Sequence, residues 1–238
     1  MAFCQISYDQ RRKIMYLLRN MNYYIREVIY KGLTYLEKEA LCNIVDQIIR
    51  LEKRHISGIF IEAGCALGGS AIVISKAKKC KRPFYIYDVF GMIPPPSEKD
   101  GEDVLKRYEV IKSGKSAGLR GNSYYGYEND LLIKVKNTFK NFKVDVDKSN
   151  IQFIKGLFQD TLVVNTPVAF AHIDSDWYQS VFTCLNRIEP FLVIGGVIVI
   201  DDYNAWSGCR RAVDEYFQDK MDSFTFIQKP RLNIIREK

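Results

Sequence analysis

Three carboxylates stand at the ends of two apolar runs in the second half of this 238-residue chain. Asp174 follows AFAHI, and Asp201 and Asp202 follow GGVIVI, with a helical pattern over 178–191 between the two runs. Because a strand–helix–strand unit brings the carboxyl ends of parallel strands to one edge of a sheet, we expect these acids to lie together. Gathered carboxylates repel one another, and burying each costs several kcal/mol unless a cation is present. A hard divalent metal such as Mg²⁺, held by oxygen ligands, is the simplest interpretation.

A glycine-rich turn follows the first predicted strand, over 59–62, and leads into a predicted helix over 71–79. Its glycines, Gly64 and Gly68 among them, let the backbone turn sharply and approach a ligand closely. Their spacing departs from the GxGxxG of dinucleotide-binding proteins. Glu62 precedes the first glycine and is expected to face a cationic group, such as the ammonium of an amino acid, rather than a pyrophosphate. The alternative is a tight loop that binds nothing.

Two further segments carry polar residues at predicted strand ends. Asp88 ends the strand predicted over 84–87, and an acid in that position can accept hydrogen bonds from both hydroxyls of a ribose. Gln159 and Asp160, in GLFQDT, are candidates to hydrogen-bond the edge of an adenine, with Phe158 stacking on it. The alternative for Asp160 is the N-terminal cap of a helix.

Strand and helix patterns alternate through most of the chain. The strands are predicted over 59–62, 84–87, 151–154, 167–174 and 197–202, and a terminal hairpin over 224–228 and 232–236. This order predicts an α/β fold, a doubly wound, seven-stranded, mostly parallel sheet with helices on both faces. Ligands bind such sheets at the carboxyl ends of the strands, which is where the polar residues named above lie.

The whole chain, 1–238, is predicted to form one domain with two special parts. An N-terminal helical cap is expected over 1–55, with Thr34 capping its last helix. The helical patterns in this cap run over 8–20, 23–30 and 35–52. The region 91–150 is irregular and has three consecutive prolines near its start, so we interpret it as an insertion that acts as a lid over the site.

Composition narrows the classes of partner. No stretch of eighteen apolar residues occurs and the first residues lack an apolar signal-peptide core, so we expect a cytoplasmic protein without a membrane partner. The net charge is +7, but the basic residues are dispersed and no RNA-binding fingerprint occurs, so no nucleic-acid partner is expected. The six cysteines form no CxxC or zinc spacing and are interpreted as free thiols.

Several segments together resemble the macrocin O-methyltransferase family. The resemblance runs from Thr34 to Phe217 and rests on EAGCALGGSA, YDVFGMIPPP, GLFQDTL, HIDSDWYQS and GGVIVIDDYNAWSGCRRAVDEYF. Family members are class I methyltransferases that use S-adenosylmethionine and a divalent metal, and they methylate sugar hydroxyls of macrolide and aminocoumarin antibiotics. The resemblance therefore implies a glycosylated small molecule or glycan as the acceptor, and a homodimer or larger homo-oligomer.

The resemblance also implies roles for individual residues. Glu62, Gly64 and Ser70 match positions that contact the methionine end of the cofactor, Gly68 belongs to the same loop, Asp88 matches the ribose position, Gln159 and Asp160 match the adenine side, and Asp174, Asp201 and Asp202 match the metal ligands. The sequence departs from the family at Ala66-Leu67, where members commonly carry a Trp-Arg or similar pair, and through 91–150, the region that shapes the acceptor pocket.

Asp174 is also expected to accept the proton of the acceptor hydroxyl. Catechol methyltransferases of the wider superfamily carry a lysine three residues after the first metal acid, and Trp177 occupies that position here. His172 is interpreted as a packed strand residue, and Trp206 either lines the sugar site or packs in the core. Two alternatives stay open: a catechol-type or other small-molecule O-methyltransferase, and a non-catalytic nucleotide-binding scaffold.

Overall fold

A seven-stranded sheet forms the centre of the protein. The computed structural model describes residues 20–238 and orders the strands β3-β2-β1-β4-β5-β7-β6. The strands are β1 (Ile59–Ala63), β2 (Phe84–Asp88), β3 (Ile151–Lys155), β4 (Val168–Ile173), β5 (Leu192–Ile200), β6 (Phe224–Gln228) and β7 (Leu232–Arg236). Strands β1 to β5 are parallel, and β7 runs antiparallel to both β5 and β6. The predicted doubly wound, mostly parallel sheet is thereby confirmed.

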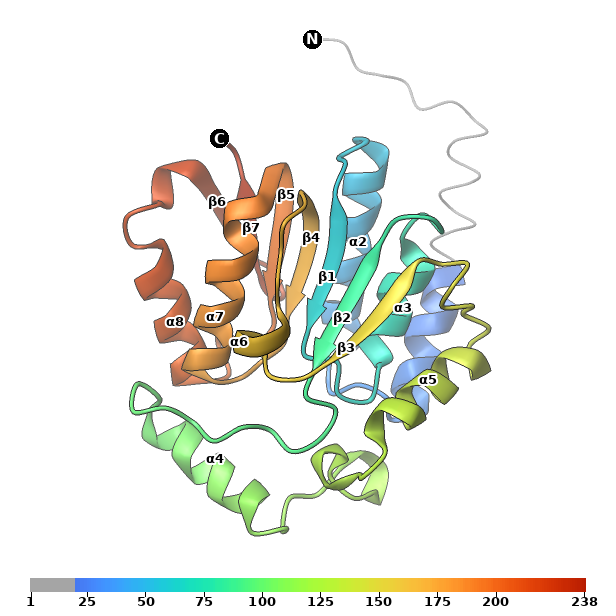
Figure 1. Ribbon diagram of the computed structural model, residues 1–238, viewed down its shortest axis with the longest axis vertical. Helices are drawn as coiled ribbons and strands as arrows, with labels where there is room; N and C mark the ends of the chain where they lie inside the picture. The colour runs from blue at the N-terminus through green and yellow to red at the C-terminus, as the bar shows by residue number, and fades with distance from the viewer. Residues whose placement is uncertain (1–19) are drawn as a thin grey trace.

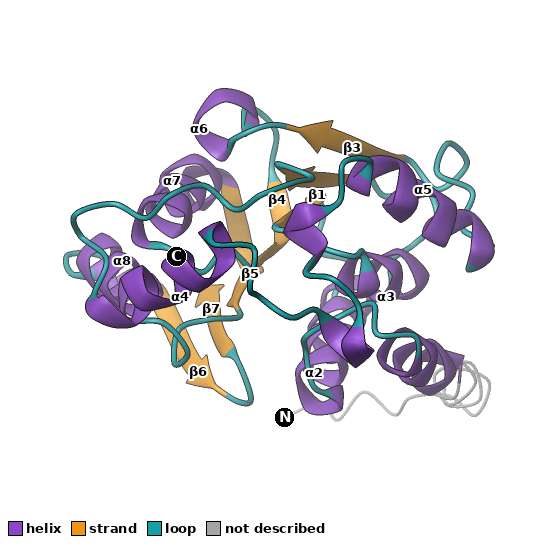
Figure 2. Ribbon diagram, turned by 90° about the horizontal axis from the view of Figure 1, so that it is seen from below, coloured by secondary structure: helices purple, strands orange, loops and turns teal. Residues whose placement is uncertain are grey.

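Helices cover both faces of this sheet (Figures 1 and 2). The helices are one over 20–30, α2 (Lys38–Lys53), α3 (Gly69–Ala77), α4 (Glu102–Lys112), α5 (Leu131–Asn141), α6 (Phe158–Thr161), α7 (Tyr178–Ile188) and α8 (Ser207–Phe217). Helices α2, α3 and α5 pack on one face, while α7 and α8 pack on the other. Within residues 20–238 no helix has the length and apolar character needed to cross a membrane.

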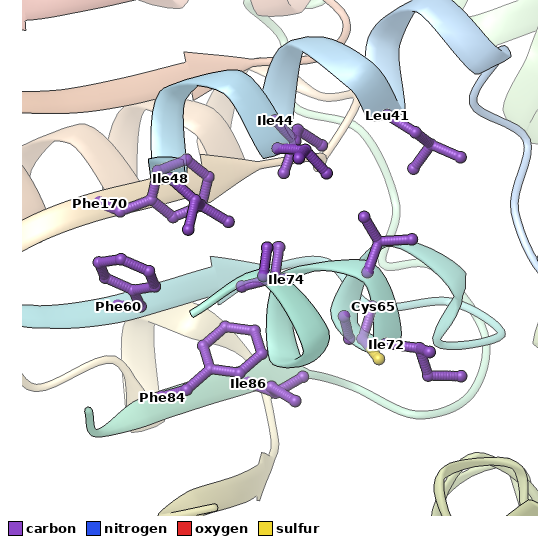
Figure 3. Close-up of a cluster of buried hydrophobic side chains, with 14 of the residues drawn as sticks. Leu41, Ile44, Ile48, Phe60, Cys65, Ile72, Ile74, Phe84, Ile86 and Phe170 are labelled. Atoms are coloured by element: carbon purple, nitrogen blue, oxygen red, sulfur yellow. The ribbon is translucent and has the colours of Figure 1, made fainter. Parts of the chain in front are cut away.

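Each face of the sheet is buried in its own apolar cluster. On the α2–α3 side, Phe60, Phe84 and Phe170 of three strands meet Ile44 and Ile48 of α2 (Figure 3). Successive side chains of a strand point to opposite faces. The neighbour of Phe60 in β1, Ile61, accordingly belongs to the cluster under α7 and α8. Burial on both faces explains why the parallel strands are continuous apolar runs.

Several predicted boundaries are wrong, and local chemistry explains them. Thr34 does not cap α2; its hydroxyl accepts a hydrogen bond from the Leu36 N–H at 3.1 Å, and the helix begins at Lys38. The helix predicted over 178–191 ends at Ile188, because Pro190 has no N–H to continue it. Strand β5 begins at Leu192 rather than at 197, and it passes Gly195 with a φ of 76°.

The two parts predicted as a helical cap and a lid both contribute helices to the core. The helix predicted over 8–20 lies, except for its last residue, outside the described residues. Helix α2, which belongs to the expected cap, packs on the sheet as part of the core. In the region 91–150, α5 buries Val135 and Phe139 in that same core. Helix α4, in contrast, lies below the carboxyl ends of the strands in Figure 1, where a lid was expected.

Lys78, just after α3, ties its own loop to the loop that precedes β3. Its side-chain ammonium donates to the carbonyl oxygens of Cys80, Arg82 and Ser149 at 3.0, 2.9 and 2.6 Å, and the residue is only 5% exposed. The substitution Lys78→Met keeps the apolar stem but removes the donor that these three carbonyl oxygens share. We expect it to lower the free energy of unfolding by about 3 kcal/mol, measured by urea denaturation.

The neighbouring residue supplies the control for this prediction. Lys79 has an exposed side chain that reaches Glu52 at 3.4 Å. Because exposed ion pairs contribute little, Lys79→Met should change the free energy of unfolding by less than about 1 kcal/mol. Equal effects of the two substitutions would contradict a structural role for the Lys78 ammonium.

Candidate active site

A cavity of about 360 Å³ opens at the carboxyl ends of the strands, and α4 contributes Arg107 and Ile111 to its lining. Residues from the ends of the five parallel strands and from the insertion line it. The polar lining includes Asp88, Gln159, Asp174, Asp176, Asp201, Asp202, Arg107 and Arg231, and the aromatic lining includes Tyr35, Tyr124, Tyr125, Phe158, Trp177 and Trp206. Its volume lies within the usual range for small-molecule sites, roughly 300–1,000 Å³.

Backbone hydrogen bonds between the strand ends hold the acids at this edge. The Asp174 N–H donates to the Ala63 carbonyl at 2.9 Å, and the Asp201 N–H donates to the Ile173 carbonyl at 3.0 Å. The pairing of β1, β4 and β5 thus continues into the acidic loops. As predicted from the strand–helix–strand spacing, Asp174, Asp201 and Asp202 all reach one cavity.

The acids that converge most closely are not the three predicted ones. Carboxylate oxygens of Asp174, Asp176 and Asp202 lie within 4.8 Å of one another. Asp201 instead forms an ion pair with Arg231, whose Nε lies 2.6 Å from the Asp201 Oδ1. Arg231 belongs to the turn between β6 and β7, and its other nitrogens bind Glu37 at 2.8 and 2.7 Å.

Asp176 was missed in the sequence, although a signal for it was present. It is the second acid of the segment Asp174-Ser175-Asp176, and its φ of 41° lies in the left-handed region. Asp tolerates that region better than most residues. Asp174 and Asp176 both line the cavity, so the turn keeps the two acids on one side.

The electrostatics of this cluster favour a bound cation. Burial, and then the neighbouring acids, raise the pKa of Asp174 and of Asp202 well above the usual range of a carboxyl. Burial raises the pKa of Asp176 to about 6, although hydrogen bonding with Asp202 opposes this rise. Among the described residues, Asp202 Oδ2 is buried and has no hydrogen-bond partner. Such a set of oxygen donors fits a hard divalent ion, which would relieve the repulsion.

The glycine turn brings β1 against the acidic loop. Gly64 has a φ of 95°, and a Cβ at this position would overlap the carbonyl oxygen of Asp174. Only glycine therefore permits this close approach. Gly68 lies farther along and packs against Val135 of α5, and Ser70 is buried in the first turn of α3. Of the three predicted loop residues named here, Gly64 alone lines the cavity.

Glu62 and His172 form a buried pair behind the cavity. They are register partners on β1 and β4, both are fully buried, and Glu62 Oε1 lies 3.1 Å from His172 Nδ1. In the described part of the chain, Glu62 Oε2 and His172 Nε2 have no partner. His172 is thus the packed strand residue that was expected. The structure points Glu62 at His172, away from the cavity lining where a ligand's ammonium was expected.

Asp88 holds the glycine turn in place. Its Oδ2 accepts hydrogen bonds from the N–H groups of Cys65 and Ala66 at 2.6 and 3.0 Å, and its Oδ1 accepts one from Phe90 at 2.6 Å. Burial raises the pKa of Asp88, while these three donors oppose the rise. Since an ionised carboxylate offers about four acceptor positions, one remains for a ligand hydroxyl.

The segment after β3 divides between cavity and surface. Gln159 lines the cavity together with Leu157 and Phe158, which form a mainly apolar slot with one amide. Asp160 is exposed in the first turn of α6 and does not belong to the lining. It is not the helix cap either, because Leu157 occupies that position.

Two tryptophans form a wall beside the acids. The rings of Trp177 and Trp206 pack edge-on with centroids 5.7 Å apart, and Trp177 Nε1 donates to the Pro94 carbonyl at 3.0 Å. Trp177 is 2% exposed and fixes the start of the insertion, whereas Trp206 is partly open to the cavity. Trp206 therefore belongs both to the packing and to the cavity lining.

The sheet order and the cavity at the strand ends define a class I methyltransferase-like fold. Residues 27–225 match the model of the macrocin-O-methyltransferase (TylF) family, and the chain belongs to that family. The resemblance noted in the sequence is thus confirmed. Among solved structures, the O-methyltransferase NovP aligns with a TM-score of 0.76 and 20% identity, over 93% of this chain and 100% of that chain.

Two curated relatives are similar over part of their length. Demethyldecarbamoylnovobiocin O-methyltransferase of Streptomyces niveus is 29% identical over 192 residues, which cover 78% of this chain. The 8-demethyl-8-(2,3-dimethoxy-alpha-L-rhamnosyl)-tetracenomycin-C 4'-O-methyltransferase of Streptomyces olivaceus is 28% identical over 167 residues, 68% of this chain. The match spans 66% of the first relative, just under two thirds, and 58% of the second.

Proposed function

We propose that this chain is a metal-dependent O-methyltransferase that transfers a methyl group from S-adenosylmethionine to a sugar hydroxyl of a glycosylated small molecule. The observation that carries the proposal is one continuous cavity. It joins Gly64, Asp88 and Gln159 on one side to the acid cluster around Asp174 on the other. A cofactor and an acceptor bound in these two halves would meet at Asp174.

The cofactor half has the chemistry that S-adenosylmethionine needs. Gly64 gives the backbone its close approach, Asp88 retains an acceptor position for a ribose hydroxyl, and the slot at Phe158 and Gln159 suits an adenine. When bound, this cofactor supplies an electrophilic methyl group on a sulfonium. The role of the chain is to align the acceptor oxygen with that methyl and to keep water out.

Asp174 and Asp202 are the proposed metal ligands on which the sequence and the structure agree. Asp201, the third ligand predicted from the sequence, and Asp176, the third member of the observed cluster, compete for the remaining position. A divalent ion held there would lower the pKa of a neighbouring sugar hydroxyl. We propose that Asp174 then accepts the proton of that hydroxyl, with Asp176 as the other carboxylate in reach.

The sugar acceptor is supported by the relatives and by the cavity. The relative from Streptomyces olivaceus is named for a rhamnosyl-tetracenomycin substrate. The acceptor half offers Trp206, Tyr124 and Tyr125, which combine apolar rings with polar edges. A catechol-type reaction is less well supported, because Trp177 occupies the position of the lysine base. A non-catalytic scaffold gives no reason for five acids around one cavity.

Binding of S-adenosylhomocysteine tests the cofactor half. Isothermal titration should give a dissociation constant in the micromolar range or tighter, which corresponds to a binding free energy on the order of −8 kcal/mol. Asp88→Ala removes both the ribose acceptor and the anchors of the glycine turn, and we expect the affinity to fall roughly tenfold or more. No binding to the unchanged protein at millimolar ligand would refute the proposed function.

Asp160→Asn is the matched control for this measurement. Asp160 is an exposed acid outside the cavity lining, so its substitution should leave the affinity for S-adenosylhomocysteine unchanged. An effect equal to that of Asp88→Ala would mean that Asp160 reaches the cofactor after all, as the sequence alone predicted. The melting temperature of each variant separates lost binding from lost folding.

A further inference from the structure

Helix α4 carries one cation toward the cavity. Val104, Arg107 and Ile111 lie at spacings of three and four, so they share one face of the helix. Val104 and Ile111 are buried, Arg107 is half-buried, and both Arg107 and Ile111 line the cavity. Arg107 is therefore the charged member of an otherwise apolar inner face.

The outer charges of α4 are paired, whereas Arg107 is not. Lys106 lies 2.9 Å from Glu102, and Lys112 lies 3.9 Å from Glu109. Within residues 20–238, Arg107 forms no hydrogen bond or ion pair, and its guanidinium carbon lies 5.8 Å from the centre of the Tyr124 ring. The other cavity cation, Arg231, is already bound by Glu37 and Asp201.

The lid segment that carries Arg107 is clamped at its start. The Asp100 Oδ1 accepts a hydrogen bond from the Tyr178 N–H at 2.7 Å, at the beginning of α7. The Asp103 carboxylate accepts bonds from the N–H and the hydroxyl of Ser207, at the beginning of α8. These bonds hold α4 over the two loops that carry the acids, so Arg107 keeps its place at the acceptor half.

A half-buried cation that forms no hydrogen bond or ion pair within residues 20–238, held over an acceptor site, is suited to bind a ligand anion. Arg107 and Asp176 line the same cavity, yet within residues 20–238 the two make no ion pair within 4.0 Å. A divalent ion bound there would offset most of the negative charge of the acid cluster, so the cluster would hold less of the charge of Arg107. A guanidinium binds carboxylate and phosphate oxygens in a two-pronged arrangement that a neutral sugar cannot offer.

We propose that the acceptor sugar carries an anionic oxygen group, a carboxylate or a phosphate, and that Arg107 binds it. This inference rests on the proposed function and narrows its substrate class. Arg107 acts as a specificity-determining residue: it selects charged acceptors and orients the sugar so that a hydroxyl faces the acid cluster. The carboxylate would come from a uronic acid, and the phosphate from a nucleotide-linked or phosphorylated sugar.

Three probes built on the same sugar separate these sources. Methyl β-D-glucoside is neutral, methyl β-D-glucuronide carries a carboxylate, and UDP-glucose carries a pyrophosphate. Their dissociation constants are measured by titration calorimetry on the full chain, saturated with S-adenosylhomocysteine and at a fixed Mg²⁺ concentration. At least one anionic probe should bind roughly tenfold or more tightly than the neutral one.

Variants of α4 assign the preference to Arg107. Arg107→Gln should weaken the preferred anionic probe roughly tenfold or more and change the neutral probe less than about twofold. Arg107→Lys should retain part of the affinity, because it keeps the charge but loses the planar fork. Lys106→Gln, on the outer face of the same helix, should behave like the unchanged protein.

Arg107 could bind the ligand, or it could only offset the negative charge of the acid cluster. The melting temperature and the pattern of binding losses distinguish these two roles. In the second case Arg107→Gln should lower the melting temperature, whereas a ligand-binding role leaves it unchanged without probe. Equal binding of all three probes, equal losses for all three in Arg107→Gln, or no anionic binding at millimolar concentration would each overturn the proposal. Failure to bind S-adenosylhomocysteine would instead refute the proposed function itself.

Discussion

Turnover is expected to disappear in EDTA and to return when Mg²⁺ is added. Five carboxylates line the cavity, and Arg231 is the one cation that pairs with any of them among residues 20–238. Burial and mutual repulsion raise the pKa of Asp174 and Asp202, so a bound cation would be favourable at this site. Asp174 and Asp202 would hold a divalent ion that relieves this repulsion and that would lower the pKa of the acceptor hydroxyl.

Metal affinity provides a readout that does not depend on turnover. Calorimetric titration should show that Mg²⁺ binds to the unchanged protein. In Asp202→Asn the affinity for Mg²⁺ should fall roughly 100-fold or more, because removing a metal ligand should lower the affinity at least as much as removing a residue that hydrogen-bonds to a ligand. Asp214→Asn is the control, because Asp214 is an acid on α8 that instead binds the Tyr203 hydroxyl at 2.8 Å. Full turnover in chelator together with unchanged affinity in Asp202→Asn would contradict the metal site.

The same titration assigns the third ligand. Asp176→Asn should weaken Mg²⁺ binding if the observed cluster is the metal site, and Asp201→Asn should do so if the predicted trio is. Arg231→Gln adds a further measurement, because it releases Asp201 from its ion pair. If Asp201 is a ligand, this release should change the affinity for the ion.

The sheet was predictable because its signals are local and repeated. A run such as Val197–Ile200, buried on both faces, leaves few alternatives to a central parallel strand. The boundaries that failed depend on distant partners. Glu37 precedes α2 and binds Arg231, 194 positions along the chain, and nothing in the local sequence at Thr34 indicates that the helix begins after this contact.

The same division holds within the site. The acids at the ends of β4 and β5 were predictable, because strand direction alone brings Asp174, Asp201 and Asp202 to one edge. The partners of these side chains were not, because pairs such as Glu62 with His172 depend on strand register. The role of Arg107 was also hidden, since α4 lies in the least regular region of the sequence.

The last prediction concerns the proton. Asp174→Asn keeps the size and one carbonyl oxygen of the side chain but removes its charge. We expect kcat to fall by roughly 100-fold or more, in line with the loss of a general base and of a metal ligand. Binding of S-adenosylhomocysteine should be nearly unchanged, because its contacts are proposed on Gly64, Asp88 and Gln159.

Two parallel variants test the assignment of the proton acceptor: Asp176→Asn and His172→Asn. If Asp176→Asn abolishes turnover while Mg²⁺ binding persists and Asp174→Asn stays active, then Asp176 accepts the proton. His172 is buried against Glu62 and does not line the cavity, so a folded His172→Asn variant should retain turnover.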